Sequence, residues 1–295
     1  MAEITTHPQP APISSIRRIV ARHPVAAFLT MMFTVDIMLS LSPVLTRRDL
    51  LPFGQAPYDW LMHILGSAVP AFLVTAALHG REGVRDLAAR CLRWRVPVRW
   101  YVFALLGTPV AMLLYSIAVY GAAPLTALAD RWTLVFTQVL PLLVVLVVFS
   151  NFAEEIGFTG FLFPRLQQRY GPLLASVVIT VPFALWHLPG WLVETGSLAM
   201  ALVSVGLFAL PQLASRVIVG WLYNGTGRSV LLVGVFHAAH NATVGAFGFA
   251  RTFIPGSDEA TLLMASDIVI AAALLIVVLT RGRLAYRPDA VDPKA

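Results

Sequence analysis

Charged residues are scarce in this sequence. Asp, Glu, Lys and Arg make up only 12% of its 295 residues, whereas a soluble domain has about 25%. Lysine is nearly absent: Lys294 is the single lysine, whereas the sequence has 20 arginines. The single cysteine, Cys91, has no partner in the chain, which excludes an intrachain disulfide. We also expect no cleavable secretory signal, since the first apolar run is long and no small-residue cleavage site stands out.

Apolar residues are correspondingly abundant. They form 58% of the chain, and the mean hydropathy is +0.78, which indicates an integral membrane protein. A helix needs about 20 apolar residues to cross the roughly 30 Å hydrocarbon core. The sequence predicts an all-α, polytopic transmembrane helical bundle of about eight spans, at 24–45, 58–79, 100–121, 136–162, 172–192, 198–222, 229–249 and 261–280.

The cationic residues between these spans divide unequally. Sixteen fall on one side, in the N-terminal arm, the 80–99 loop, the segments after spans 4 and 6, and the tail. Four fall on the other side: Arg47, Arg48, Arg131 and Arg251. Because cytoplasmic loops carry the excess of Lys and Arg, we predict that both termini are cytoplasmic. The remaining cation, Arg216, falls inside span 6.

Short turns between the spans leave no room for a second domain. We expect a cytoplasmic N-terminal arm over 1–23, a single transmembrane domain over 24–280 and a cytoplasmic tail over 281–295. The net charge of +6 lies where topology and anionic headgroups account for it, which predicts membrane lipids, and no nucleic acid, as partners. The basic stretch 82–99 is either an interfacial helix or a plain topology signal.

Ionisable residues concentrate in spans 4, 5 and 7. Each charged side chain at a bilayer centre costs roughly 2.5 to 3.5 kcal/mol, so such residues tend to be functional. The candidates are Glu154 and Glu155 in span 4, His187 in span 5, and His237, His240 and Asn241 in span 7. Two isolated polar residues are interpreted as structural contacts between helices: Asp36 and His63.

Helix geometry separates the roles of the two glutamates. Adjacent residues point about 100° apart, so if Glu154 faces a cavity shared with spans 5 and 7, Glu155 faces a neighbouring helix. His237 and Asn241 are four residues apart and share a face. A carboxylate, two histidines and an asparagine can activate water and stabilise an oxyanion. The alternative is a zinc ion with one open position, held by His187, His237 and Glu154.

Straight helices would not bring the two histidines together. At 1.5 Å per residue, His187 lies roughly 24 Å from the predicted start of span 5, whereas His237 is only about 8 residues into span 7. We therefore expect span 5 to be tilted, to begin outside the membrane, or to bend near Pro182.

Three segments follow one another on these spans: EEIGFT at 154–159, FALWH at 183–187 and HAAHN at 237–241. They resemble the motifs of the CAAX prenyl protease and bacteriocin-processing (CPBP, Abi) family of intramembrane endopeptidases. The family pattern is Glu-Glu-x-x-x-Arg, then Phe-x-x-x-His, then His-x-x-x-Asn or Asp. The resemblance covers about 130–250, which would be the protease-like core of the domain.

The resemblance implies a role for each matching residue. Glu154 would activate water, with His187 as its partner or as a second base, and Phe183 matches the aromatic position of the second motif. His237 and Asn241 would line the oxyanion site, with His240 beside them. This arrangement needs no cofactor, and zinc stays the alternative.

The sequence departs from the family at Thr159, which stands where the motif has Arg. Glu155, four residues earlier, thereby loses its expected cation. A buried glutamate must find another cation, accept hydrogen bonds or be protonated. Three alternatives follow: Arg216 replaces the motif arginine, Thr159 hydrogen-bonds a protonated Glu155, or catalysis has been lost.

The expected function is an intramembrane endopeptidase that acts on membrane-associated or prenylated peptide or protein substrates. We expect it in the inner (plasma) membrane of a bacterium, because the excess of Arg over Lys is usual in GC-rich genomes. One alternative is a catalytically inactive immunity or peptide-binding protein of the same fold. Another is a transporter, which would show an internal repeat that this sequence lacks.

Overall fold

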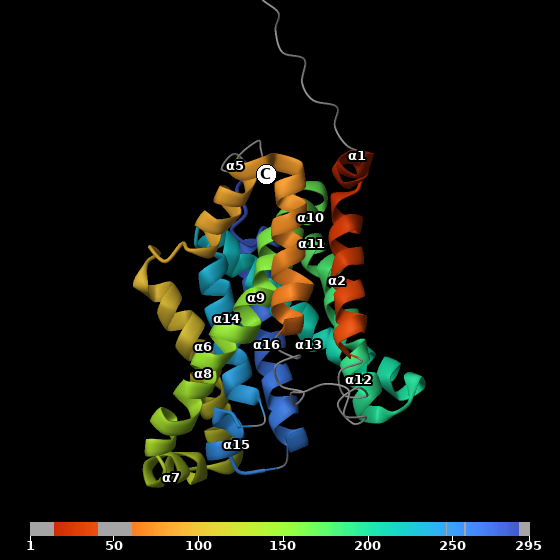
Figure 1. Ribbon diagram of the computed structural model, residues 1–295. Helices are drawn as coiled ribbons and strands as arrows, with labels where there is room; N and C mark the ends of the chain where they lie inside the picture. The colour runs from red at the N-terminus through yellow and green to blue at the C-terminus, as the bar shows by residue number, and fades with distance from the viewer. Residues whose placement is uncertain (1–14, 41–60, 246, 257, 289–295) are drawn as a thin grey trace, which may run out of the picture.

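The computed structural model describes residues 15–40, 61–245, 247–256 and 258–288, which form helices and no strand. Figure 1 shows the helices gathered in one elongated bundle. The first three expected spans correspond to α2 (Pro24–Ser40), to η1 (Ile64–Ala68) with α5 (Val69–Cys91), and to α6 (Val98–Tyr120). The fourth is a continuous series of short helices: η2 (Val135–Val139), α8 (Leu140–Leu146), η3 (Val147–Asn151), α9 (Phe152–Glu155), η4 (Ile156–Leu162) and α10 (Phe163–Tyr170). The last four correspond to α11 (Pro172–Trp186) with α12 (Leu188–Thr195), α13 (Leu198–Gly225), α14 (Val230–Val244) and α16 (Asp258–Thr280). Three short helices complete the described chain: α1 (Ser15–Arg22), α7 (Ala123–Asp130) and α15 (Phe249–Phe253).

Seven helical segments of the described chain are long and apolar enough to cross a membrane. The remaining expected span, 24–45, corresponds to α2, a shorter apolar helix of 17 residues. The all-α polytopic architecture is therefore confirmed. The side on which the termini lie and the domain limits stay predictions. Several parts of those predictions fall outside the described residues: 1–14, 41–45, Arg47, Arg48, 58–60 and 289–295.

α6 illustrates how a membrane determines the surface of the bundle. Its buried positions recur every four residues and include two hydroxyl side chains: Ala104, Thr108, Met112 and Ser116. Apart from Arg99 in its first turn, its exposed positions are apolar and include Val102, Leu106, Val110 and Leu114. Such a helix would be unstable in water but suits contact with lipid chains, where packing of small residues holds helices together.

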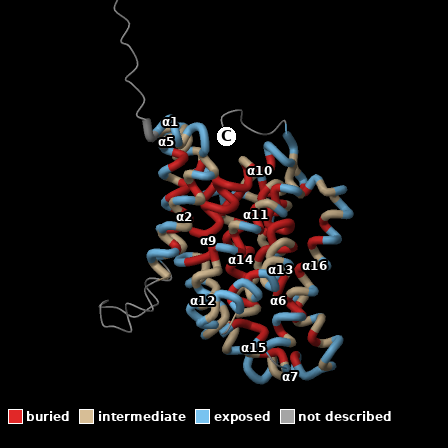
Figure 2. Tube along the Cα trace, turned by 90° about the vertical axis from the view of Figure 1, so that its right-hand side faces the viewer, coloured by how far each residue is buried: buried red, intermediate tan, exposed pale blue. Residues whose placement is uncertain are grey.

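Glycines allow close helix packing in the interior, which lies where α9, α11, α13 and α14 meet (Figure 2). A Cβ atom at Gly157 would collide with the Ser67 side chain and lie 2.9 Å from the Ser67 carbonyl oxygen. A Cβ atom at Gly234 would lie 2.9 Å from Cα of Phe152. Small residues therefore hold η1 and α14 against the segment that carries the two glutamates.

α5 bends at Gly80, whose φ of 60° and ψ of −148° are not helical and favour glycine. The helix after this bend occupies part of the predicted interfacial stretch. Its apolar residues Leu87 and Cys91 are buried in the protein, and Arg90 donates a hydrogen bond of 2.7 Å to the Gly160 carbonyl. A helix is thus present, but these apolar side chains pack against protein and not against the membrane surface.

α10 connects the fourth span to the fifth span, which carries His187. The fourth span continues through this more polar helix, so the whole segment covers 36 residues, Val135–Tyr170. α11 starts directly afterwards at Pro172 and ends at Trp186, immediately before His187. Pro182 lies inside α11, and the position of span 5 relative to the membrane stays a prediction.

We predict that Gly157→Ala destabilises the protein, because the new methyl group has no space between η4 and η1. Overpacking of this kind costs about 1 to 3 kcal/mol of unfolding free energy. The matched control is Gly206→Ala on α13, where a Cβ atom would meet nothing within 4 Å. Thermal unfolding in detergent checks both variants, and equal melting temperatures would contradict the close packing.

Candidate active site

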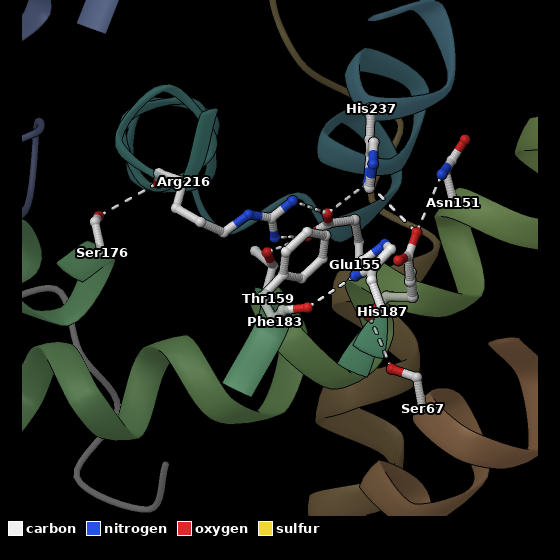
Figure 3. Close-up of polar contacts among 10 residues, drawn as sticks. Ser67, Asn151, Glu155, Thr159, Ser176, Phe183, His187, Arg216 and His237 are labelled. Carbon is white, nitrogen blue, oxygen red and sulfur yellow. Dashed lines mark hydrogen bonds and ion pairs between the residues drawn. The ribbon is translucent and has the colours of Figure 1, made fainter. Parts of the chain in front are cut away.

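Glu155 is the centre of a buried cluster that joins α9 to α13 and α14 (Figure 3). Arg216 contacts both of its carboxylate oxygens, with Nη2–Oε1 at 2.8 Å and Nη1–Oε2 at 3.2 Å. The two side chains are 0% and 1% exposed. Bidentate contact is the strong form of the Arg–carboxylate interaction. A cation from another helix therefore occupies the role that the motif arginine would have.

Arg216 is thus the partner that the first alternative named, and the second alternative is met only in its hydrogen bond, since it assumed a protonated Glu155. Thr159, one turn after Glu155, donates a hydrogen bond to Oε2, the oxygen that also contacts Arg216. The guanidinium carbon of Arg216 lies 4.1 Å from the centre of the Phe183 ring, which adds a cation–π contact. The cationic partner stabilises an ionised Glu155, so Thr159 acts as a further donor to the carboxylate.

His237 connects the two glutamates. Its Nδ1 lies 2.8 Å from Oε1 of Glu155 and 3.7 Å from Oε2 of Glu154. A carboxylate oxygen can only accept, so Nδ1 carries a hydrogen, and Nε2 is the nitrogen left for other groups. The glutamates share this histidine, although their remaining partners lie on different helices.

Glu154 is buried but has no Arg or Lys partner within the described part of the chain. Asn151, one turn earlier, donates a hydrogen bond of 3.1 Å to Oε2. Ser67 on η1 donates to the Glu154 backbone carbonyl at 2.9 Å. His63 and His187 are near enough to interact electrostatically with the carboxylate. Imidazole and amide groups, and not a permanent cation, thus surround Glu154.

His187 is held at the end of α11 by its own helix. Its Nδ1 lies 2.9 Å from the Phe183 carbonyl oxygen, so this nitrogen donates and Nε2 is the free position. The ring packs between the rings of Phe183 and Phe208, with centroid distances of 5.0 and 4.8 Å. The aromatic contacts fix the ring orientation next to Glu154.

The other predicted residues of α14 have fewer contacts. Asn241 lies one turn after His237, is partly buried, and its side chain makes no hydrogen bond to another described residue. Nδ1 of His240 is buried and has no hydrogen-bond partner in the described chain. The structure thus brings Glu154, Glu155, His187 and His237 together and leaves the Asn241 amide available to a ligand.

Three contacts of Glu154 were not among the predicted site residues: Asn151, Ser67 and His63. The spacing of Asn151, three residues before Glu154, is a signal that places both on one helix face. His63 also contacts the Trp186 ring edge-on at 5.4 Å, in keeping with its interpretation as a contact between helices. No sequence signal pairs Ser67 with a residue 87 positions away.

The backbone around the glutamates is π-helical. η3 and η4 flank α9, which contains both glutamates, and η1 lies against it. Three of the donors to the glutamates belong to these segments: Ser67, Asn151 and Thr159. Single π-helical turns inside α-helices are frequent at functional sites. The local widening of the helix therefore coincides with the polar cluster.

The zinc alternative does not fit the described residues. No group of three or more His, Cys, Asp or Glu side chains in the described chain is arranged to hold a metal ion. We therefore derive no step through a metal.

Comparison with known proteins agrees with the motifs. Residues 136–243 match the family described as type II CAAX prenyl endopeptidase Rce1-like. A relative named "CAAX prenyl protease 2", from Methanococcus maripaludis, is 30% identical over 105 residues. This segment is therefore similar to the CAAX prenyl protease family. The resemblance seen in the sequence is thereby confirmed.

The matched region contains all three CAAX protease motifs. The alignment with the relative covers 34% of this chain and 38% of the relative's length. Arg216 also lies inside the matched region, so the residue that pairs with Glu155 belongs to the same part of the chain as the family motifs.

We predict that Arg216→Met destabilises the protein by about 3 to 5 kcal/mol, because it leaves the Glu155 carboxylate buried and unpaired. Glu155→Gln is also expected to be destabilising, and the double variant should cost less than the sum of the two, since the residues interact directly. Denaturant unfolding in detergent gives the coupling energy.

The matched control for this cycle is Arg251→Met. Arg251 pairs with Asp258 at 3.1 Å, but the side chains are 33% and 65% exposed. Removing an exposed pair costs at most about 1 kcal/mol. Equal losses for Arg216→Met and Arg251→Met would contradict an ionic Glu155–Arg216 contact.

Proposed function

We propose that this chain is an intramembrane endopeptidase in which Glu154 activates water for peptide-bond hydrolysis. The observation that carries the proposal is the different pairing of the two glutamates. Glu155 is neutralised by Arg216, whereas Glu154 has only Asn151 and imidazole groups around it. A carboxylate without a permanent cation keeps its capacity to accept a proton.

The proposed role of His237 requires a hydrogen on each of its ring nitrogens. Two ionised glutamates and Arg216 give a net charge of −1, which is costly in a buried site. A proton on His237 brings the cluster to neutrality, because Nδ1 lies beside both carboxylates. The imidazolium then carries a hydrogen on Nε2 as well, which can be donated to a substrate.

The reaction follows from these positions. Glu154 removes a proton from water, and the oxygen adds to the carbonyl carbon of the scissile bond. The C–N bond breaks as the nitrogen takes the proton from Glu154, which leaves a carboxylic acid and an amine. Nε2–H of His237 and the Asn241 amide stabilise the negative oxygen of the intermediate, and His187 orients the water through Nε2.

The substrate class follows from where the site lies. The glutamates are buried in a multi-pass helical bundle, so the scissile bond has to enter from a membrane-associated peptide or protein. The name of the Methanococcus maripaludis relative adds prenylated peptides as a candidate class. We propose the inner (plasma) membrane of a bacterium as its location, because the sequence has 20 arginines and one lysine, a ratio usual in GC-rich genomes.

We predict that Glu154→Gln lowers kcat/KM by about 100- to 10,000-fold, the usual range for loss of a general base. The assay uses the purified full chain in detergent with a quenched farnesylated peptide and an unprenylated peptide library. Glu194→Gln on α12 is the control, because Glu194 is an exposed carboxylate. A zinc chelator should leave the wild-type rate unchanged.

The same assay separates the alternatives. Activity that survives Glu154→Gln would contradict the proposed base, and activity lost to the chelator would contradict the metal-free reaction. Folded wild-type protein that binds peptides and cleaves none would favour the peptide-binding or immunity protein of the same fold.

We predict that Asn151→Ala lowers kcat/KM by about 10- to 100-fold, because a hydrogen bond to a charged group contributes about 1.5 to 3 kcal/mol. Asn151→Ser retains a donor and should recover part of this loss. Asn151→Ala should also lower the melting temperature, because the lost bond is buried, so kcat/KM is compared at a temperature at which all three proteins are folded. Unchanged kcat/KM in both would show that Asn151 does not orient Glu154.

A further inference from the structure

A large basic cavity lies at one end of the bundle, and no residue of the glutamate cluster lines it. Its volume is about 1150 Å³, and it is bounded by the ends of α6, α13 and α16 and by the segment after α16. Five arginines line it: Arg93, Arg99, Arg228, Arg283 and Arg287. No acidic residue of the described chain is among the lining residues.

The five guanidinium groups have no carboxylate partner in the described chain. The arginines that do form ion pairs there lie elsewhere: Arg90, Arg216 and Arg251. Four of the five are exposed and Arg228 is half-buried, so solvent reaches them. Five like charges around one space repel one another, and an anion in that space would relieve the repulsion.

An unsatisfied donor supplies a second, independent indication of a ligand. Trp100 lines the cavity, is only 9% exposed, and its indole N–H has no hydrogen-bond partner in the described chain. An indole N–H can only donate, so it calls for an acceptor. The ring contacts Trp221 at 4.7 Å, and the Arg99 guanidinium lies 5.8 Å from its centre. The cavity therefore combines aromatic walls with donors.

The segment after α16 is fixed as one wall of the cavity. Leu284 is fully buried, its carbonyl accepts a hydrogen bond of 3.1 Å from Asn224, and its N–H donates to Thr280 at 3.2 Å. These contacts hold Arg283 and Arg287 on the cavity side. This part of the predicted C-terminal tail is thus a structural element of the site.

We propose that this cavity binds the phosphate group of an anionic phospholipid. Arginine forks suit phosphate oxygens, and basic pockets between helices near the cytoplasmic surface bind anionic headgroups. Trp and Tyr side chains gather where a bundle meets the headgroup region. The five arginines also belong to the side predicted to be cytoplasmic.

The neighbouring surface favours a lipid over a soluble phosphate compound. Thr280 lines the cavity, and the two residues before it, Val278 and Leu279, are 71% and 73% exposed. A headgroup in the cavity would let its acyl chains lie along this apolar surface of α16. A soluble phosphate would use the arginines alone.

The test is native mass spectrometry of the delipidated full chain in neutral detergent. The ligands are phosphatidylglycerol, phosphatidylcholine with the same acyl chains, and inorganic pyrophosphate. We expect phosphatidylglycerol to bind at least about 10-fold more tightly than phosphatidylcholine. The variant Arg93→Gln/Arg283→Gln/Arg287→Gln should lose this binding by about 100-fold, because each cation near a headgroup contributes about fivefold.

The matched control is Arg81→Gln/Arg85→Gln/Arg169→Gln, which removes three exposed arginines outside the cavity. It should retain wild-type affinity within about threefold. If the triple variant does not fold, Arg287→Gln alone replaces it in the test. This single variant should bind phosphatidylglycerol about fivefold more weakly than the wild type. Equal losses in the cavity and control variants, or no preference for the anionic lipid, would overturn the proposal. Displacement of phosphatidylglycerol by equimolar pyrophosphate would overturn the lipid as the source of the phosphate.

Discussion

The buried contact between Glu155 and Arg216 is the interaction on which the rest of the site depends. Moving two charges out of water is unfavourable unless their geometry is good and their remaining polar atoms have partners. Here the pair is bidentate, Thr159 and His237 add hydrogen bonds, and the Phe183 ring covers the guanidinium. The pair joins α9 to α13 and leaves the adjacent glutamate as the carboxylate with no fixed cation.

The glutamate cluster and the basic cavity have opposite arrangements of charge. In the glutamate cluster, opposite charges lie within hydrogen-bonding distance, so the cluster is almost complete by itself. In the basic cavity, charges of one sign surround a large space, so the protein alone does not complete it. The first arrangement suits chemistry on a substrate, whereas the second suits binding of an anion from the surroundings.

Much of the fold was predictable because a membrane restricts backbone structure to helices and sets their length. Hydropathy alone therefore gave the spans. Hydropathy could not predict the bend at Gly80, because it contains no information on backbone angles. It could not predict the burial of Leu87 either, because an apolar residue has the same hydropathy whether it contacts lipid or protein. The π-helical turns beside Glu154 were also beyond prediction, since they depend on packing against η1 and α14. In the site, Arg216 was recognisable as a lone cation within a span, whereas Ser67 had no sequence signal.

Isotope-edited infrared spectroscopy tests the central claim most directly, because it reads the ionisation of each glutamate. Difference spectra of ¹³C-glutamate-labelled protein, wild type minus Glu154→Gln, report the form of Glu154 at neutral pH. We predict the loss of a carboxylate band in this difference and in the corresponding one for Glu155→Gln. Loss of a protonated carboxylic acid band on Glu154→Gln would contradict this prediction, because a protonated Glu154 could not act as the base.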